Sequence, residues 1–279
     1  MTGTLFLCAT PIGNLKDMTP RVVDTLKEAD MIAAEDTRNS IKLLNYFDIR
    51  TPMTSYHEYN KVEKADQIIG WLHQGKNIAL ITDAGTPAIS DPGEVLVAKC
   101  LEAGIPITSL PGCCACITAL TLSGLPARRF CFEGFLPADK KERKSILEEL
   151  KRETRTIILY EAPHHLKKTL GELLECLGDR RATLCRELTK KFETVFPTTL
   201  EKAAEFYKEN EPKGEYVLVL EGISRRELAK EKQGEWEKLT LEEHMQVYEE
   251  QGVERKEAMR KVASDRGISK REVYQGLLQ

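Results

Sequence analysis

Short apolar runs alternate with helical segments through the first half of the chain. The runs predict strands over residues 4–10, 31–34, 78–82 and 107–110. Between them, the patterns predict helices over residues 21–29, 61–73 and from Asp91-Pro92 to about Gly104. Thr19 is a suitable N-cap and Pro20 a suitable first helical residue for the first of these. This alternation is typical of a mostly parallel sheet covered by helices on both faces.

The second half repeats the pattern with different spacing. Strand-like runs occupy residues 130–135, 156–160, 183–188 and 216–220, with helical stretches over 144–151, 164–177 and 200–209. The Gly124-Leu125-Pro126 segment predicts a boundary, which gives one α/β domain over residues 1–124 and another over 125–223. After Gly222 the sequence becomes polar and helical, and residues 235–279 predict a small helix-turn-helix-like unit.

Composition limits the class of protein. The chain has 279 residues, 41% of them apolar and 30% charged, and a formal net charge of -3. These values and the lack of a long apolar run predict a cytoplasmic globular protein with large cores. Eight cysteines are scattered, and Cys113-Cys114-x-Cys116 lacks the paired spacing of a zinc site, so we expect no metal.

Three loops that follow predicted strands carry the candidate chemistry. They are "ATPIGNL" (9–15), "DAGTPAISDPG" (83–93) and "LPGCCACITAL" (110–120). In open parallel sheets, ligands bind beyond the carboxyl ends of the strands. Each loop has Gly and Pro but no Lys, which disfavours a triphosphate and suits a nucleoside-like ligand approached by main chain. The alternative is that Gly and Pro are ordinary turn residues.

Longer motifs carry a family resemblance. They are "GTLFLCATPIGNLKDMTPR", "AAEDTR", "SYHEYN", "TDAGTPAISDPG", "GFLPADKKERKSILEEL", "YEAPHHL" and "CRELTKKFE". Together, over residues 3–223, they resemble the ribosomal RNA small subunit methyltransferase I group of the tetrapyrrole methylase superfamily. The resemblance implies two α/β domains with S-adenosylmethionine in the cleft between them, and a homodimer. It also implies methylation of the ribose 2′-O of a decoding-region cytidine in 16S rRNA.

The resemblance also implies cofactor contacts, matched position by position. These are Pro11, Ala84, Gly85, Thr86, Ile89, Cys114 and Ala115 in the first domain, and Glu161 and Leu188 in the second. For Ile89 and Ala115 the alternative is core packing. The chain departs from the family pattern at Cys113-Cys114, at Tyr59 and at His165, where Pro-Ser, His and Arg are more usual.

Methyl transfer to a hydroxyl benefits from a base that accepts its proton. Glu35, Asp36 and Arg38 follow a predicted strand and are therefore the catalytic candidates. One carboxylate could accept the proton, while Arg38 could hold a phosphate or fix a carboxylate. The alternative is that Asp36 or Thr37 caps the next helix and that Arg38 pairs with Glu35.

Basic segments predict contacts with the RNA partner, 16S rRNA within the 30S subunit. The candidates are Lys140, Lys141, Arg143 and Lys144, then Arg186 and Lys190, and in the tail Arg260, Lys270 and Arg271. A solvated helix face is the alternative for the first segment, and a helical appendage packed on the body is the alternative for the tail. Two other functions stay open: a small-molecule methyltransferase acting on a tetrapyrrole, and a non-enzymatic RNA-binding protein.

Overall fold

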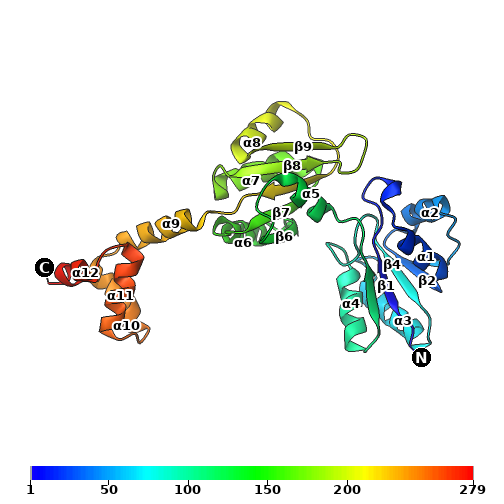
Figure 1. Ribbon diagram of the computed structural model, residues 1–279, viewed down its shortest axis with the longest axis horizontal. Helices are drawn as coiled ribbons and strands as arrows, with labels where there is room; N and C mark the ends of the chain where they lie inside the picture. Colours follow the sequence, from blue (N-terminus) through cyan, green and yellow to red (C-terminus); the bar gives the residue numbers. More distant parts are fainter. Residues whose placement is uncertain (1, 279) are drawn as a thin grey trace. The chain divides into compact units, whose positions relative to one another are not determined.

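The computed structural model describes residues 2–278, which form two compact units. Among the described residues, the larger unit contains 2–148 together with 155–221, and the smaller contains 149–154 and 222–278. Two five-stranded sheets, both in the larger unit, organise the fold (Figure 1). The predicted boundary near Gly124 lies between the last strand of the first sheet and the first strand of the second.

The first sheet is entirely parallel, with strand order β3-β2-β4-β1-β5. Its strands are β1 (Leu5–Cys8), β2 (Met31–Ala34), β3 (Met53–Ser55), β4 (Ile78–Ile81) and β5 (Ile107–Leu110). Four of them lie within the predicted apolar runs. The edge strand β3 was not predicted, because three half-buried residues make too short a run to stand out.

Helices cover both faces of this sheet, as predicted (Figure 1). They are α1 (Pro20–Glu28), α2 (Thr37–Tyr46), α3 (Lys61–His73) and α4 (Gly93–Glu102), preceded by the short η1 (Leu15–Asp17). Alternate residues of β4 divide between two cores: Ile78 and Leu80 pack with α3 and α4, and Ala79 and Ile81 pack with α1 and α2. The Thr19 hydroxyl caps α1 by accepting from the Val22 amide, which confirms the predicted helix start.

The second sheet is mixed, with strand order β6-β7-β10-β8-β9. Its strands are β6 (Phe130–Phe135), β7 (Thr156–Glu161), β8 (Arg181–Arg186), β9 (Thr194–Thr199) and β10 (Tyr216–Leu220). β6 pairs in parallel with β7, whereas β10 runs antiparallel to both β7 and β8. The unpredicted strand β9 lies at the edge and contains Pro197, which suits only an edge position.

The helices of this half follow the predicted stretches, with one addition. They are α5 (Ala115–Ser123), α6 (Lys140–Lys151), α7 (Pro163–Leu177) and α8 (Leu200–Glu209). Helix α5 joins the first sheet to the second, and its Cys116, Ala119 and Leu120 pack against the second sheet. Helix α6 begins at Lys140, four residues before the predicted start, because the Asp139 carboxylate caps the amides of Lys141 and Glu142.

The smaller unit is helical. It contains α9 (Arg225–Glu237), α10 (Leu241–Glu250), α11 (Arg255–Arg266) and α12 (Lys270–Gly276). Met245, Val262 and Val273 are buried in a core of their own. The predicted turn ends α11 at Gly267, which has φ +63°, and Ser269 caps α12 in a reciprocal pair with Glu272. Among residues 2–278, none of the helices is both long and apolar enough to cross a membrane.

Candidate active site

Hydrogen bonds join the three Gly- and Pro-containing loops at the carboxyl edge of the first sheet. Thr10 and Gly85 form an isolated bridge, with N···O distances of 2.8 and 3.0 Å between their amides and carbonyls. The Thr86 hydroxyl donates to the Cys113 carbonyl at 2.9 Å. The loops that follow β1, β4 and β5 are therefore bonded to one another and form one surface. This arrangement favours a binding site over the alternative of three unrelated turns.

The loop after β4 has an uncommon backbone. Ala88 and Ser90 have φ of +69° and +64°, a region that costs non-glycine residues free energy. Asp91 stabilises this conformation, because its Oδ1 accepts from the amides of Ala88 and Gly93 at 3.0 and 2.8 Å. Burial raises the pKa of the Asp91 carboxyl despite these bonds. The loop is thus fixed in one shape by its own carboxylate.

A cavity of about 440 Å³ lies against these loops, between the two α/β halves of the larger unit. Its volume falls in the range of about 300–1,000 Å³ that is common for small-molecule sites. Apolar and polar side chains share its wall. The lining comprises Ile12, Glu35, Thr82, Asp83, Ala84, Gly85, Thr86, Ile89, Ser90, Asp91, Cys114, Ala115, Phe135, Tyr160, Glu161, Ala162, Cys185, Leu188, Lys190, Glu215, Tyr216 and Val217.

Eight of the nine expected cofactor residues line this cavity: Ala84, Gly85, Thr86, Ile89, Cys114, Ala115, Glu161 and Leu188. Pro11 is not part of the lining, and its neighbour Ile12 takes that place. Ile89 is 41% exposed at the cavity wall, so the alternative of core packing does not hold for it. Ala115 lines the cavity and also packs against the core of the second sheet.

Sequence reasoning missed several lining residues from the second half. Phe135 ends β6 and lines the cavity, so the carboxyl-edge rule, applied again, would have pointed to it. Tyr216 instead begins β10, opposite Glu161. Because β10 is antiparallel, its first residue reaches the edge where β7 ends, and no local signal in the sequence reveals this.

Carboxylates dominate the charge of the cavity wall. Five of them line it: Glu35, Asp83, Asp91, Glu161 and Glu215. Lys190 is the only Lys or Arg in the described lining, and its Nζ lies 2.9 Å from Glu187 and 2.8 Å from Glu215. Burial opposes the charge of Lys190, but the bonds to Glu215 and Glu187 raise its pKa overall. The cavity therefore suits a ligand with positive charge rather than a polyphosphate.

Of the three catalytic candidates, only Glu35 lines the cavity. Its Oε2 accepts from the Thr82 hydroxyl at 2.6 Å and from the Asp83 amide at 3.3 Å. Asp36 is the N-cap of α2 and accepts from the Arg38 amide at 2.9 Å, as its alternative interpretation predicted.

Arg38 pairs with Asp36 and not, as one alternative had it, with Glu35. Its Nε and Nη2 lie 3.1 and 2.8 Å from the Asp36 carboxylate, and these bonds lower the pKa of that carboxyl to about 2. The Arg38 side chain is 88% exposed and is not among the residues that line the cavity. Asp36 and Arg38 thus form a surface pair that begins a helix.

Two thiols meet at the start of α5. The Sγ atoms of Cys114 and Cys116 are 3.3 Å apart, and the Cys116 amide donates to the Tyr160 hydroxyl at 3.1 Å. The bond from the Cys116 thiol lowers the pKa of Cys114 to about 6, while the same contact and burial raise that of Cys116. Within residues 2–278, no group of three or more His, Cys, Asp or Glu side chains is arranged to hold a metal ion.

The four basic residues expected to contact RNA at the start of α6 do not share one environment. Lys140, Lys141 and Lys144 are exposed. Arg143 is 8% exposed, and its guanidinium is bonded to Thr169, Glu172 and main-chain carbonyls. The expectation of an RNA contact is therefore wrong for Arg143, because an amphipathic helix directs this position into the protein.

The remaining basic candidates differ in availability. Arg186 is half-buried and donates to the Phe192 carbonyl at 3.4 Å, and Lys190 lies in the cavity wall. In the smaller unit, Arg260 is exposed but paired with Glu257 at 3.0 Å, Lys270 is half-buried and Arg271 is exposed. The side chains of Arg186 and Lys190 are thus bonded within the larger unit, whereas that of Arg271 is exposed to solvent.

Comparison with known proteins gives the following relatives. The family model of the Tetrapyrrole (Corrin/Porphyrin) Methylases matches residues 4–204. A "Ribosomal RNA small subunit methyltransferase I" from Halalkalibacterium halodurans is 49% identical over 98% of this chain and 93% of its own length. One of the same name from Bacillus subtilis is 49% identical with the same coverage.

Among solved structures, the fold is similar to that of uroporphyrin-III C-methyl transferase from Thermus thermophilus, determined in complex with S-adenyl homocysteine. That likeness has a TM-score of 0.55 and 19% identity and covers 78% of this chain and 97% of that one. At such identity it shows a shared fold alone.

Proposed function

Because the chain belongs to the tetrapyrrole methylases and, within them, to the ribosomal RNA small subunit methyltransferase I family, we propose that it methylates small-subunit ribosomal RNA with S-adenosylmethionine. The acceptor is the ribose 2′-O of a decoding-region cytidine in 16S rRNA. The observation that carries this proposal is the acidic cavity at the joined strand ends, which suits a cationic nucleoside. Ribosomal RNA as substrate places the enzyme in the cytoplasm.

The residues of the cavity fit S-adenosylmethionine. The main chain at Ala84, Gly85 and Thr86 allows close approach, because Gly85 has φ +91° and no side chain. Ile89 and Leu188 supply apolar walls for the nucleoside, and the carboxylates match the positive charge. When bound, S-adenosylmethionine supplies an activated methyl group on a sulfonium sulfur.

Glu35 is the proposed base. Both hydrogen bonds that its carboxylate accepts within the described structure end on Oε2, which leaves Oε1 to accept the proton of the ribose hydroxyl. The Thr82 hydroxyl and the Asp83 amide fix the orientation of the carboxylate. A base placed in this way contributes about 10²- to 10⁴-fold to rate.

The RNA is held outside the cavity. Lys140, Lys141 and Lys144 are exposed on α6 and would contact phosphates, as would the exposed Arg271 of the smaller unit. The 30S subunit is the proposed substrate particle, and the enzyme is a homodimer. Light scattering of the purified protein tests the second statement.

The decisive experiment uses 30S subunits from cells that lack this methylation. They are incubated with the protein and S-adenosylmethionine labelled in the methyl group, and the nucleosides are then separated by mass spectrometry. The proposal expects label in 2′-O-methylcytidine from 16S rRNA. Label on a base, or no label in either 30S subunits or free 16S rRNA, would refute it.

A further inference from the structure

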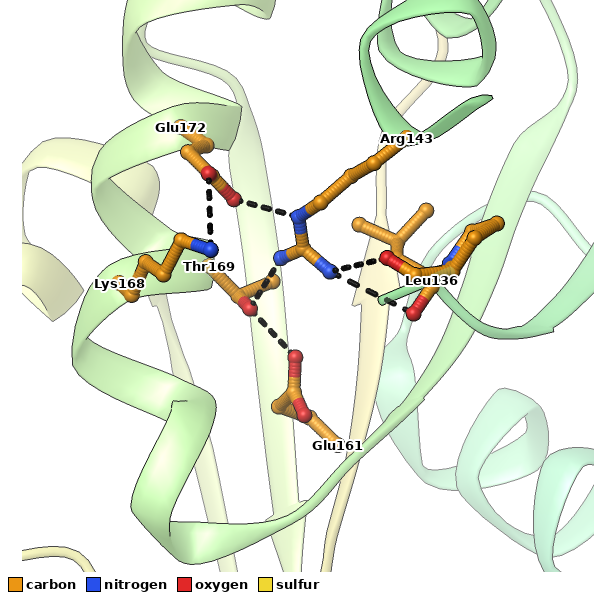
Figure 2. A network of polar contacts seen from close by, with 7 residues as sticks. Leu136, Arg143, Glu161, Lys168, Thr169 and Glu172 are labelled. Atoms are coloured by element: carbon orange, nitrogen blue, oxygen red, sulfur yellow. Dashed lines mark hydrogen bonds and ion pairs between the residues drawn. The ribbon is translucent and has the colours of Figure 1, made fainter. Parts of the chain in front are cut away.

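Arg143 is the centre of a buried polar network between α6 and α7 (Figure 2). Its Nε donates to Glu172 Oε2 at 2.7 Å, and its Nη2 donates to the Thr169 hydroxyl oxygen at 2.7 Å. Its Nη1 donates to the carbonyls of Leu136 and Pro137 at 3.4 and 3.5 Å. A buried guanidinium with every nitrogen bonded has one fixed position.

The donors of this network have a fixed direction. A guanidinium only donates, so the Thr169 oxygen accepts from Arg143 and its single proton must point elsewhere. That proton is donated to Glu161 Oε2 (Figure 2). The Ala162 amide donates to Glu161 Oε1 at 2.8 Å. Each oxygen of the Glu161 carboxylate therefore accepts one bond from the protein and keeps a free lone pair.

The two carboxylates of this hydrogen-bond network differ in their counterions. Glu172 forms an ion pair with Arg143 and also lies 3.6 Å from Lys168. Glu161 is 5% exposed and makes no direct ion pair within residues 2–278, since a hydroxyl separates it from the guanidinium. A buried carboxylate without a direct counterion is costly unless a ligand supplies the positive charge. Glu161 lines the cavity, so a ligand can do so.

We propose that Arg143 and Thr169 are positioning residues that aim the Glu161 carboxylate at the ammonium group of the methyl donor. This rests on the proposed function, because the ammonium belongs to the methionine part of S-adenosylmethionine. An ammonium has three N–H donors and matches the free lone pairs of Glu161, whereas a sulfonium has none. Glu161 binds the donor, and Thr169 acts only through Glu161.

Thr169→Val tests this directly, because valine keeps the shape and removes the hydroxyl. The matched control is Thr183→Val, since Thr183 is similarly buried but donates to the Ser123 carbonyl at 3.0 Å, whereas Thr169 donates to Glu161, a residue of the cavity lining. Calorimetry measures the affinity for S-adenosylmethionine, for S-adenosylhomocysteine, which keeps the ammonium but loses the sulfonium charge, and for 5′-methylthioadenosine, which lacks the amino acid.

We expect Thr169→Val to bind S-adenosylmethionine and S-adenosylhomocysteine on the order of tenfold more weakly. Its affinity for 5′-methylthioadenosine stays unchanged, Thr169→Ser restores binding, and Thr183→Val changes none of the three. In turnover, KM for the donor rises while kcat at saturation is kept, because Glu161 does not touch the acceptor oxygen.

Three results would overturn the proposal. Equal losses for all three ligands would place the effect on the nucleoside or on the structure of the site and not on the ammonium group. A loss for S-adenosylmethionine alone would assign Glu161 to the sulfonium, and unchanged binding would show that Thr169 does not act on the ligand through Glu161. Failure of the wild-type protein to bind any of them would instead refute the proposed function, so the two failures are distinguishable.

Discussion

Replacing Gly85 by alanine tests the site through its backbone. A Cβ built on Gly85 would lie 3.4 Å from Ile12 Cγ2 and 3.6 Å from the Cys113 carbonyl oxygen, which is ordinary contact. The cost is therefore conformational, because φ is +91° and the amide and carbonyl are both bonded to Thr10. Holding a non-glycine residue in such a conformation costs about 1–3 kcal/mol.

If the loop of the Gly85→Ala protein relaxes to another conformation in the absence of ligand, this conformational cost appears as a loss of ligand affinity. The ligand must then restore the original loop, and about 1–3 kcal/mol corresponds to a 5- to 150-fold loss of affinity. Calorimetry with S-adenosylhomocysteine measures it, and thermal unfolding measures stability. We expect Gly85→Val to lose more than Gly85→Ala, since a branched side chain resists positive φ more strongly.

Gly104→Ala is the matched control. Gly104 has φ +65° at the end of α4, and no atom lies within 4 Å of a Cβ built there. Its replacement should lower stability by about 1–2 kcal/mol and leave affinity unchanged. A folded Gly85→Ala protein with wild-type affinity would refute the placement of the ligand against this loop.

Four further predictions concern the other charged groups and the tail. Glu35→Gln should lower kcat by at least about 100-fold with little change in donor affinity, while Arg38→Ala should lower kcat less; equal small effects would exclude Glu35 as the base. The pKa of Asp36 is lowered to about 2, so its ion pair stabilises the fold at neutral pH and is lost as the pH falls through that value. The melting temperature of Asp36→Asn should thus be lower than that of the wild type at pH 7 and converge with it toward pH 2. Replacing the three exposed lysines at the start of α6 by alanine should reduce the salt slope of RNA binding by about 2, and an unchanged slope would place the phosphates elsewhere. A chain ending at Gly222 should stay folded and bind S-adenosylhomocysteine but methylate 30S subunits less well, and full activity would remove the tail from the RNA site.

Local patterns predicted the first half of the fold well because its signals are local. Each central strand is a buried apolar run, and Thr19 caps α1 with its own side chain. The same holds for the loop after β4, where Gly and Pro lie directly behind the strand. The short β3 has no such run, and the Pro-containing edge strand β9 lacks an uninterrupted one.

Long-range pairing explains what the sequence left open. The antiparallel placement of β10 brings Tyr216 beside Glu161, 55 positions earlier in the chain, and nothing in either segment announces the other. In the sequence, Arg143 stands among exposed lysines. Its partners Thr169 and Glu172 lie in α7, which is separated from α6 by the strand β7. A count of basic residues cannot separate a buried guanidinium from a solvated one.

The order of the second sheet also constrains how the chain is synthesised. All five strands of the first sheet lie before residue 111, so that half can form while the remainder is still being translated. In the second sheet, β10 is the last strand to be made and the central one, between β7 and β8. Until it emerges, β7 and β8 present unpaired edges that can associate with other chains. The nascent protein is therefore most prone to aggregate, and most in need of a chaperone, in the interval before residue 220 leaves the ribosome.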